Sequence, residues 1–229
     1  MRFDELKERM EAPVFRVGDV ARITGKPKAY CRLYLLRLER RKKVVRIERG
    51  SYCLPGADLY AVASNLILPS YVSFLSALAF HHLTTQVPVQ VQVAAARQKK
   101  GLEFGNARVI FIKLKTKALF GFGKQGEAFI AEREKAIIDC LYQPGRAPVS
   151  EVLYALKQGE LDVGRLEEFA EQLGSTVVKK RLGFLLESAG LQTRIKPRLN
   201  TKMDLLNPLN PKEGKTSGKW RLVLNEVFE

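Results

Sequence analysis

Cysteine and histidine are scarce in this sequence, and both scarcities argue against a metal centre. The three cysteines, Cys31, Cys53 and Cys140, are odd in number, widely spaced and set among apolar residues. We therefore expect buried thiols and neither a disulfide framework nor a zinc site. His81 and His82 are adjacent near a predicted helix end, where they make a poor chelate and act as simple C-terminal caps. The sequence thus predicts no metal site.

Long apolar runs are missing as well. None approaches the roughly 18 residues that a membrane-spanning helix needs. The opening segment, residues 1–13, lacks the apolar core of a signal peptide. We therefore expect a cytoplasmic protein with no membrane partner.

Catalytic motifs are equally scarce. Gly121, Gly123 and Gly126 precede a strand pattern instead of opening a helix, which is wrong for a phosphate loop. The Gly214-Lys-Thr sequence resembles the end of such a loop, but Leu209 stands where its first glycine is required. Paired carboxylates in a metal motif are also lacking. The sequence therefore predicts that the chain is not an enzyme and uses no cofactor.

Acidic residues are the minority among the charged ones. The 229 residues include 39 Lys and Arg against 24 Asp and Glu, a formal net charge of +15. The excess concentrates in residues 1–58 and 193–221, with a nearly balanced body between them. Such a length suits two domains, which we predict over residues 1–58 and 59–229 because Pro55-Gly56 interrupts the chain.

The densest basic stretch is Lys26–Arg49, with ten basic and two acidic residues. Cys31, Leu35 and Leu38 recur at helical spacing within it, so we predict a packed helix whose opposite side is charged. Leu33 falls on that charged side, where it would contact either a thymine methyl or another protein. The residues predicted to bind DNA are Lys26, Lys28, Tyr30, Arg32, Arg37, Arg40, Arg41, Lys43, Arg46 and Arg49.

The order of segments around this helix is typical of a winged helix-turn-helix. A short amphipathic helix ends at Pro13, and a second helix follows with Asp19 as its expected N-cap and Gly25 at its end. After the basic helix, residues 44–50 and 51–54 are predicted as two strands joined by a glycine turn, which form the wing.

The rest of the chain mixes strands and helices, so the predicted fold class is α+β: a winged helix-turn-helix followed by a mixed domain with a small sheet and a helical bundle. A helix is predicted over residues 71–83, strands over 87–95, 108–114, 120–122 and 128–131, and helices over 132–142, 149–157, 163–173 and 175–189. Residues 219–225 alternate as a closing strand.

A second basic surface is predicted near the C-terminus. It would extend the DNA footprint, contact RNA or merely solubilise the tail, and the sequence does not decide among these. Its residues are Arg194, Lys196, Arg198, Lys202, Lys219 and Arg221.

Five stretches in this order resemble the AbiEi antitoxins, the regulatory halves of abortive-infection toxin–antitoxin pairs. They are RIERGSYCLPG at residues 46–56, PSYVSFLSALAFHHLTTQVP at 69–88, EREKAIIDCLY at 132–142, VVKKRLGFLLESAGL at 177–191 and KWRLVLN at 219–225. His82 stands where the family is expected to favour a glycine, and Lys42 stands where many winged helices of this type have one.

The resemblance implies a transcriptional autorepressor that binds repeated sites in its own promoter as double-stranded DNA. It also implies an antitoxin domain that counteracts a nucleotidyltransferase-like toxin, without a stable complex in many such systems. Two alternatives stay open at this point: a winged-helix transcription factor whose C-terminal domain senses a ligand or partner, and, less favoured, an enzyme acting on nucleic acid or on the toxin.

Overall fold

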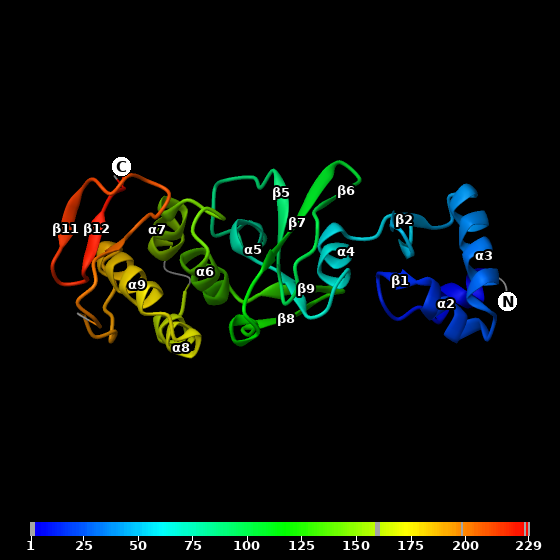
Figure 1. Cartoon of the computed structure of the whole chain (residues 1–229), viewed down its shortest axis with the longest axis horizontal. Coiled ribbons are helices and arrows are strands. Elements are labelled where there is room, and N and C mark those ends of the chain that lie inside the picture. The colour runs from blue at the N-terminus through cyan, green and yellow to red at the C-terminus, as the bar shows by residue number, and fades with distance from the viewer. Residues whose placement is uncertain (1–2, 159–160, 198, 227, 229) are drawn as a thin grey trace.

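The computed structural model describes residues 3–158, 161–197, 199–226 and 228. The chain is elongated, and its two ends lie at opposite extremes of the long axis (Figure 1). Helices and several sheets make up an α+β fold, as predicted. Along the axis, an N-terminal unit of residues 3–53 is followed by a six-stranded sheet and then by a helical region that ends in a small sheet (Figure 1).

The N-terminal unit contains three helices and an antiparallel three-stranded sheet. The helices are α1 (Phe3–Glu8), α2 (Val17–Thr24) and α3 (Lys28–Arg40), and the strands are β1 (Phe15–Arg16), β2 (Val45–Glu48) and β3 (Ser51–Cys53), in the order β1-β3-β2. Their core includes Leu6, Phe15 and Val20 together with Cys31, Leu35 and Leu38 of α3. The apolar stripe predicted for the basic helix is therefore confirmed.

The helix ends follow local rules with one correction. Asp19, expected as the N-cap of α2, lies inside its first turn and accepts a hydrogen bond of 2.8 Å from the backbone N–H of Arg16, which is the true N-cap. Gly25 ends α2 in the left-handed conformation at φ 66°, as predicted. Lys42 follows α3 with φ 55°, and its backbone N–H donates to the carbonyl of Glu39.

The central sheet has six strands in the order β6-β7-β5-β4-β9-β8, more than the small sheet expected. Its elements are α4 (Leu59–Asn65), β4 (Ser70–Val72), α5 (Phe74–Phe80), β5 (Gln90–Ala95), β6 (Leu102–Phe104), β7 (Ala107–Lys113), the 3-10 helix η1 (Thr116–Ala118), β8 (Phe122–Gln125) and β9 (Ala128–Ala131). The helix expected from Tyr71 is wrong in its first part. Tyr71 belongs to β4, an inner strand, and α5 starts only at Phe74.

Four helices and a small sheet complete the chain. They are α6 (Arg133–Tyr142), α7 (Val149–Lys157), α8 (Val163–Leu173), α9 (Thr176–Ser188), β10 (Asp204–Leu205), β11 (Lys215–Ser217) and β12 (Leu222–Leu224). Trp220, the only tryptophan, packs against Gly183 of α9, where an added Cβ would lie 2.1 Å from a ring carbon. No helix in the described part of the chain is long and apolar enough to span a membrane.

The N-terminal unit is held against the central sheet. Val14 and Cys53 belong to the large core that contains the sheet, and Ile47 of β2 packs on it. The Arg16 guanidinium donates a hydrogen bond of 2.7 Å to the carbonyl of Leu66. Shared packing and this hydrogen bond fix how the two parts are oriented.

Candidate nucleic-acid interface

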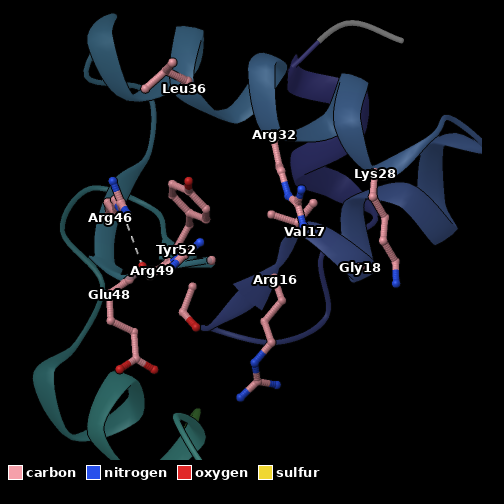
Figure 2. A pocket seen from close by; sticks show the side chains of 12 residues that line it. Arg16, Val17, Gly18, Lys28, Arg32, Leu36, Arg46, Glu48, Arg49 and Tyr52 are labelled. Carbon is pink, nitrogen blue, oxygen red and sulfur yellow. Dashed lines mark hydrogen bonds between the residues drawn. The ribbon is translucent and has the colours of Figure 1, made fainter.

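A groove rich in cations runs between α3, the β2–β3 hairpin and the start of α2 (Figure 2). Its volume is about 740 Å³, and we call it the basic groove. It brings together cations that are distant in the sequence. Its lining residues are Arg16, Val17, Gly18, Lys28, Arg32, Leu36, Arg46, Glu48, Arg49, Gly50, Ser51 and Tyr52.

Helix periodicity and a rigid base explain this arrangement. Lys28, Arg32 and Leu36 are spaced four residues apart on α3, so they form one stripe along the groove. The opposite side of α3 is anchored by its buried apolar residues. From the hairpin, Tyr52 is 6% exposed and stacks on Phe15 with ring centroids 6.3 Å apart.

The charges in the groove are poorly balanced. Lys28, Arg32 and Arg49 are exposed, and none of them is in an ion pair within the part of the chain that the structure describes. The single acidic residue, Glu48, pairs with Lys99, whose Nζ lies 2.6 Å from Glu48 Oε2. Uncompensated cations crowded around one hollow create a positive potential that attracts a polyanion.

The sequence of this region matches a known family. Residues 5–55 match the family model described as "Transcriptional regulator, AbiEi antitoxin". This segment, which we call the AbiEi segment, is similar to AbiEi regulators. The resemblance to this family predicted above is therefore confirmed there, and the segment includes every residue that lines the basic groove.

A solved structure matches the chain beyond the AbiEi segment. The Rv2827c protein from Mycobacterium tuberculosis has 16% sequence identity and a TM-score of 0.59, over 96% of this chain and 90% of that one. At this identity the likeness concerns the fold alone. Among curated proteins no match is found.

The other residues of the AbiEi segment predicted to bind DNA lie outside the groove lining. Lys26, Arg37, Arg40 and Arg41 are exposed. Tyr30 is 52% exposed and stacks on Tyr34, with ring centroids 6.3 Å apart. Leu33 is exposed beside it. These residues form an outer face of α3 that adjoins the groove.

Lys43 is placed differently. Its ammonium lies 5.4 Å from the centroid of the Phe3 ring, so it stacks on α1. Unlike Lys28 and Arg32, Lys43 therefore does not line the groove.

The structure distributes the predicted second basic surface over several environments. Lys202 Nζ lies 3.5 Å from Asp204, and Lys219 pairs with Glu187. Arg221 is half-buried with φ 54°, whereas Arg194 and Lys196 are exposed. Arg198 lies outside the described residues. Two of these cations are thus compensated by carboxylates.

A polar cluster that sequence analysis missed lies inside the central region. Lys135 and Asp139 of α6 are fully buried and form an ion pair. Asp139 Oδ2 also accepts hydrogen bonds of 3.0 Å from the Tyr71 hydroxyl and 2.7 Å from the Ser73 hydroxyl. Opposite charges at i and i+4 were the available signal, but this spacing is equally typical of exposed pairs.

Burial governs the chemistry of this cluster. Desolvation lowers the pKa of Lys135 and raises the pKa of Asp139; the ion pair counters both shifts, and the two hydroxyl donors counter the shift of Asp139. The Lys135 ammonium also lies 4.7 Å from the centroid of the Phe120 ring. Because both side chains of the pair are inaccessible to solvent, we assign the cluster to the stability of the fold.

The remaining titratable candidates are structural. All three cysteines are buried and free, and burial raises the pKa of the Cys53 thiol to about 11. His81 Nε2 lies 2.7 Å from the carbonyl oxygen of Ala131, and burial lowers its pKa. No group of three or more His, Cys, Asp or Glu suited to a metal occurs among the residues described.

Proposed function

We propose that residues 1–58 form a winged helix-turn-helix that binds double-stranded DNA at repeated sites in the promoter of its own operon. In this proposal the chain is a sequence-specific autorepressor in the cytoplasm. The observation that carries it is the basic groove, which lies within the AbiEi regulator segment.

In this proposal α3 and the β2–β3 hairpin contact different parts of the duplex. The N-terminal part of α3 enters the major groove, where Lys28 and Arg32 contact base edges or flanking phosphates. Arg46 and Arg49 bind the backbone or the minor groove from the hairpin, which acts as the wing. The outer face of α3 completes the interface. Its proposed members are Lys26, Tyr30, Arg37, Arg40 and Arg41, with Lys43 at the helix end.

The second half of the proposal concerns residues 59–229. As an antitoxin domain this region counteracts a nucleotidyltransferase-like toxin, without the need for a stable complex. Its basic residues near the C-terminus are proposed to contact nucleic acid. The match of the AbiEi segment supports this role through the family description.

Footprinting of the upstream region at two salt concentrations tests the DNA half. We expect protection of repeated sites and an affinity that falls steeply with salt, because each phosphate contact releases counterions. The double variant Lys28→Glu/Arg32→Glu should abolish binding while its circular dichroism and melting temperature stay unchanged. Lys124→Glu/Lys157→Glu, at exposed positions outside the AbiEi segment, is the matched control and should bind normally. Undiminished binding by the first variant would exclude the basic groove as the interface.

A second candidate function is a transcription factor of unrelated targets that senses a ligand. A hollow of about 450 Å³ beside α4 favours it, because its lining is mainly apolar and includes Leu59, Tyr60, Phe80 and Ile130. The neighbouring gene separates the two candidates. A nucleotidyltransferase gene beside this one supports the antitoxin, and its absence supports the sensor.

A further inference from the structure

Helix α3 carries a second apolar stripe on the side away from the core. Ala29, Leu33 and Leu36 follow the spacing i, i+4 and i+7, which places them on one side of the helix. The buried residues of α3 repeat the same spacing two residues later, so the two stripes lie about 200° apart around the helix axis. We call Ala29, Leu33 and Leu36 the outer stripe.

The outer stripe is exposed to solvent. Leu33 is 57% exposed, Leu36 is 37% exposed, and Ala29 is exposed as well. In the rest of the N-terminal unit, residues 3–53, the large apolar side chains that are exposed are Tyr30, also on α3, and Val45 on β2. Single apolar side chains on a surface need no explanation, but contiguous ones mark an interaction site. The outer stripe is therefore a contact surface for a partner.

Cations flank the outer stripe on both sides. Arg32 precedes Leu33 by one residue and lies about 100° to one side of it, where Arg32 and Lys28 line the basic groove (Figure 2). Arg37 follows Leu33 by four residues and lies about 40° to the other side. Lys28, Arg32 and Arg37 are exposed, and none of them is in an ion pair with another described residue. A matching partner has an apolar centre between two anionic margins.

The major groove of DNA has this arrangement. Its walls are phosphate backbones, and its floor exposes the base edges, on which the C5-methyl group of thymine is the apolar feature. A helix in the groove places its outermost residues on the floor and its flanking residues beside the phosphates. Alanine and leucine side chains form no hydrogen bonds, so on the floor they contact methyl groups. An apolar protein surface, in contrast, would leave the flanking cations without partners.

We propose that the outer stripe contacts thymine methyl groups on the floor of the major groove, with Leu33 at the centre of the contact. This inference rests on the proposed DNA-binding function and adds the base that the protein prefers. The repeated sites should therefore contain thymines, on either strand, where the middle of α3 crosses the groove. Loss of one methyl contact should weaken binding about fourfold, the factor expected for one buried methylene-sized group.

The test uses the full chain and two duplexes of one footprinted site, one natural and one in which deoxyuridine replaces every thymine. The replacement removes only the C5-methyl groups and keeps the base pairs. We expect the wild type to bind the uridine duplex about 4–16-fold more weakly, which corresponds to one or two methyl contacts.

Leu33→Ala should show a similar loss on the natural duplex and almost no further loss on the uridine duplex, because the two changes remove the same contact. Its slope of log affinity against log salt should equal that of the wild type, since no phosphate contact is lost. Leu33→Met keeps an apolar side chain and should keep the uridine effect. Leu209→Ala, at an exposed leucine outside the AbiEi segment, is the matched control and should behave as the wild type on both duplexes.

Equal binding of the two duplexes by the wild type, or an undiminished uridine effect in Leu33→Ala, would overturn the methyl contact while the proposed function stands. A footprinted site without thymine would overturn it too. If the uridine effect is absent and Leu33→Ala also changes the molar mass in solution, the outer stripe is instead an interface between copies of this chain. If the wild type binds neither duplex, the proposed function itself fails.

Discussion

Lys99, beyond the end of β5, and Glu48, at the end of β2, form an ion pair of 2.6 Å that joins the central sheet to the hairpin. The pair is partly exposed, so its contribution to stability is small. Its larger effect is electrostatic, because Glu48 is the only carboxylate among the residues that line the basic groove.

Glu48→Gln should therefore tighten DNA binding. The change removes a negative charge from the groove and frees Lys99 to contact phosphate, so we expect an affinity about three to ten times higher at low salt. Fluorescence anisotropy with the labelled operator measures this. Asp58→Asn, a change of equal charge outside the groove lining, is the control. Weaker binding by Glu48→Gln would show that the pair positions the hairpin instead.

Glycine at two left-handed positions should stabilise the chain. Lys42 and His82 lie two residues beyond the last residue of α3 and α5 and have φ 55° and 59°, a conformation that costs an L-residue about 1–2 kcal/mol relative to glycine. We expect Lys42→Gly and His82→Gly each to raise the free energy of unfolding by about 0.5–1 kcal/mol, after the added freedom of the unfolded chain is subtracted. Chemical denaturation measures the change. Arg41→Gly, at φ −87°, should instead be destabilising.

Removing one partner of the buried Lys135–Asp139 ion pair in α6 should destabilise the fold strongly. Asp139→Ala leaves the Lys135 ammonium and two hydroxyl groups without their acceptor, and we expect a loss of about 3–5 kcal/mol in the free energy of unfolding. Lys135→Met/Asp139→Asn should recover most of that loss, because it removes both charges, keeps volume and leaves an amide oxygen to accept from the two hydroxyl groups. Urea denaturation of both variants provides the comparison. A double variant no more stable than Asp139→Ala would contradict a compensated ion pair.

His81 should make stability depend on pH. Burial lowers its pKa from the ordinary 6.5, Arg133 lowers it further, and the Ala131 carbonyl and Glu134 oppose the shift. The unfolded chain thus binds the proton at a higher pH than the folded chain does. The contribution of His81 is complete above pH 6.5 and is lost as pH falls from 6.5 through the lower pKa of the folded state.

Melting temperatures between pH 8 and pH 5 measure this loss. His81→Gln, which keeps a hydrogen-bond donor for Ala131, should show a smaller decline than the wild type over that range. An identical decline in the two proteins would assign the pH dependence to other groups.

Gly183 should tolerate no side chain, although it lies within α9. Alanine normally favours a helix over glycine by about 1 kcal/mol. Here the new Cβ would lie 2.1 Å from the Trp220 ring, so we expect Gly183→Ala to destabilise the chain by about 1–3 kcal/mol. Gly18→Ala in α2, with no atom within 4 Å of the new Cβ, is the matched control and should be neutral or stabilising. Thermal unfolding of both variants decides the point.

Local sequence signals predicted the elements of the N-terminal unit well. The spacing of Cys31, Leu35 and Leu38 identified the buried side of α3, and Gly25 identified the end of α2, because both depend on neighbouring residues alone. The residues that line the basic groove were harder to predict from the sequence. A helical wheel centres the charged side on Tyr30 and Leu33, whereas the groove lies beside Lys28 and Arg32 because tertiary packing places the hairpin there.

Arrangements that join distant segments could not be predicted from the sequence, because tertiary packing determines them. Tyr71 looked helical because the apolar period of α5 extends back to it, but pairing with β5 and β9 makes its segment a strand. Arg97, Lys99 and Lys113 come from two segments whose adjacency depends on the parallel pairing of β5 with β7. Charge totals taken along the chain had marked this region as nearly balanced.

The position of Trp220 has a practical consequence for optical experiments. It is the sole indole, it is 1% exposed, and its Nε1 donates to Glu187 at 2.8 Å. It lies between β11 and β12, which are at the opposite end of the molecule from α3 (Figure 1). Emission excited at the red edge of protein absorbance therefore monitors only this distal end. Melting of the N-terminal unit would be invisible to it and must be followed through tyrosine absorbance or an attached dye.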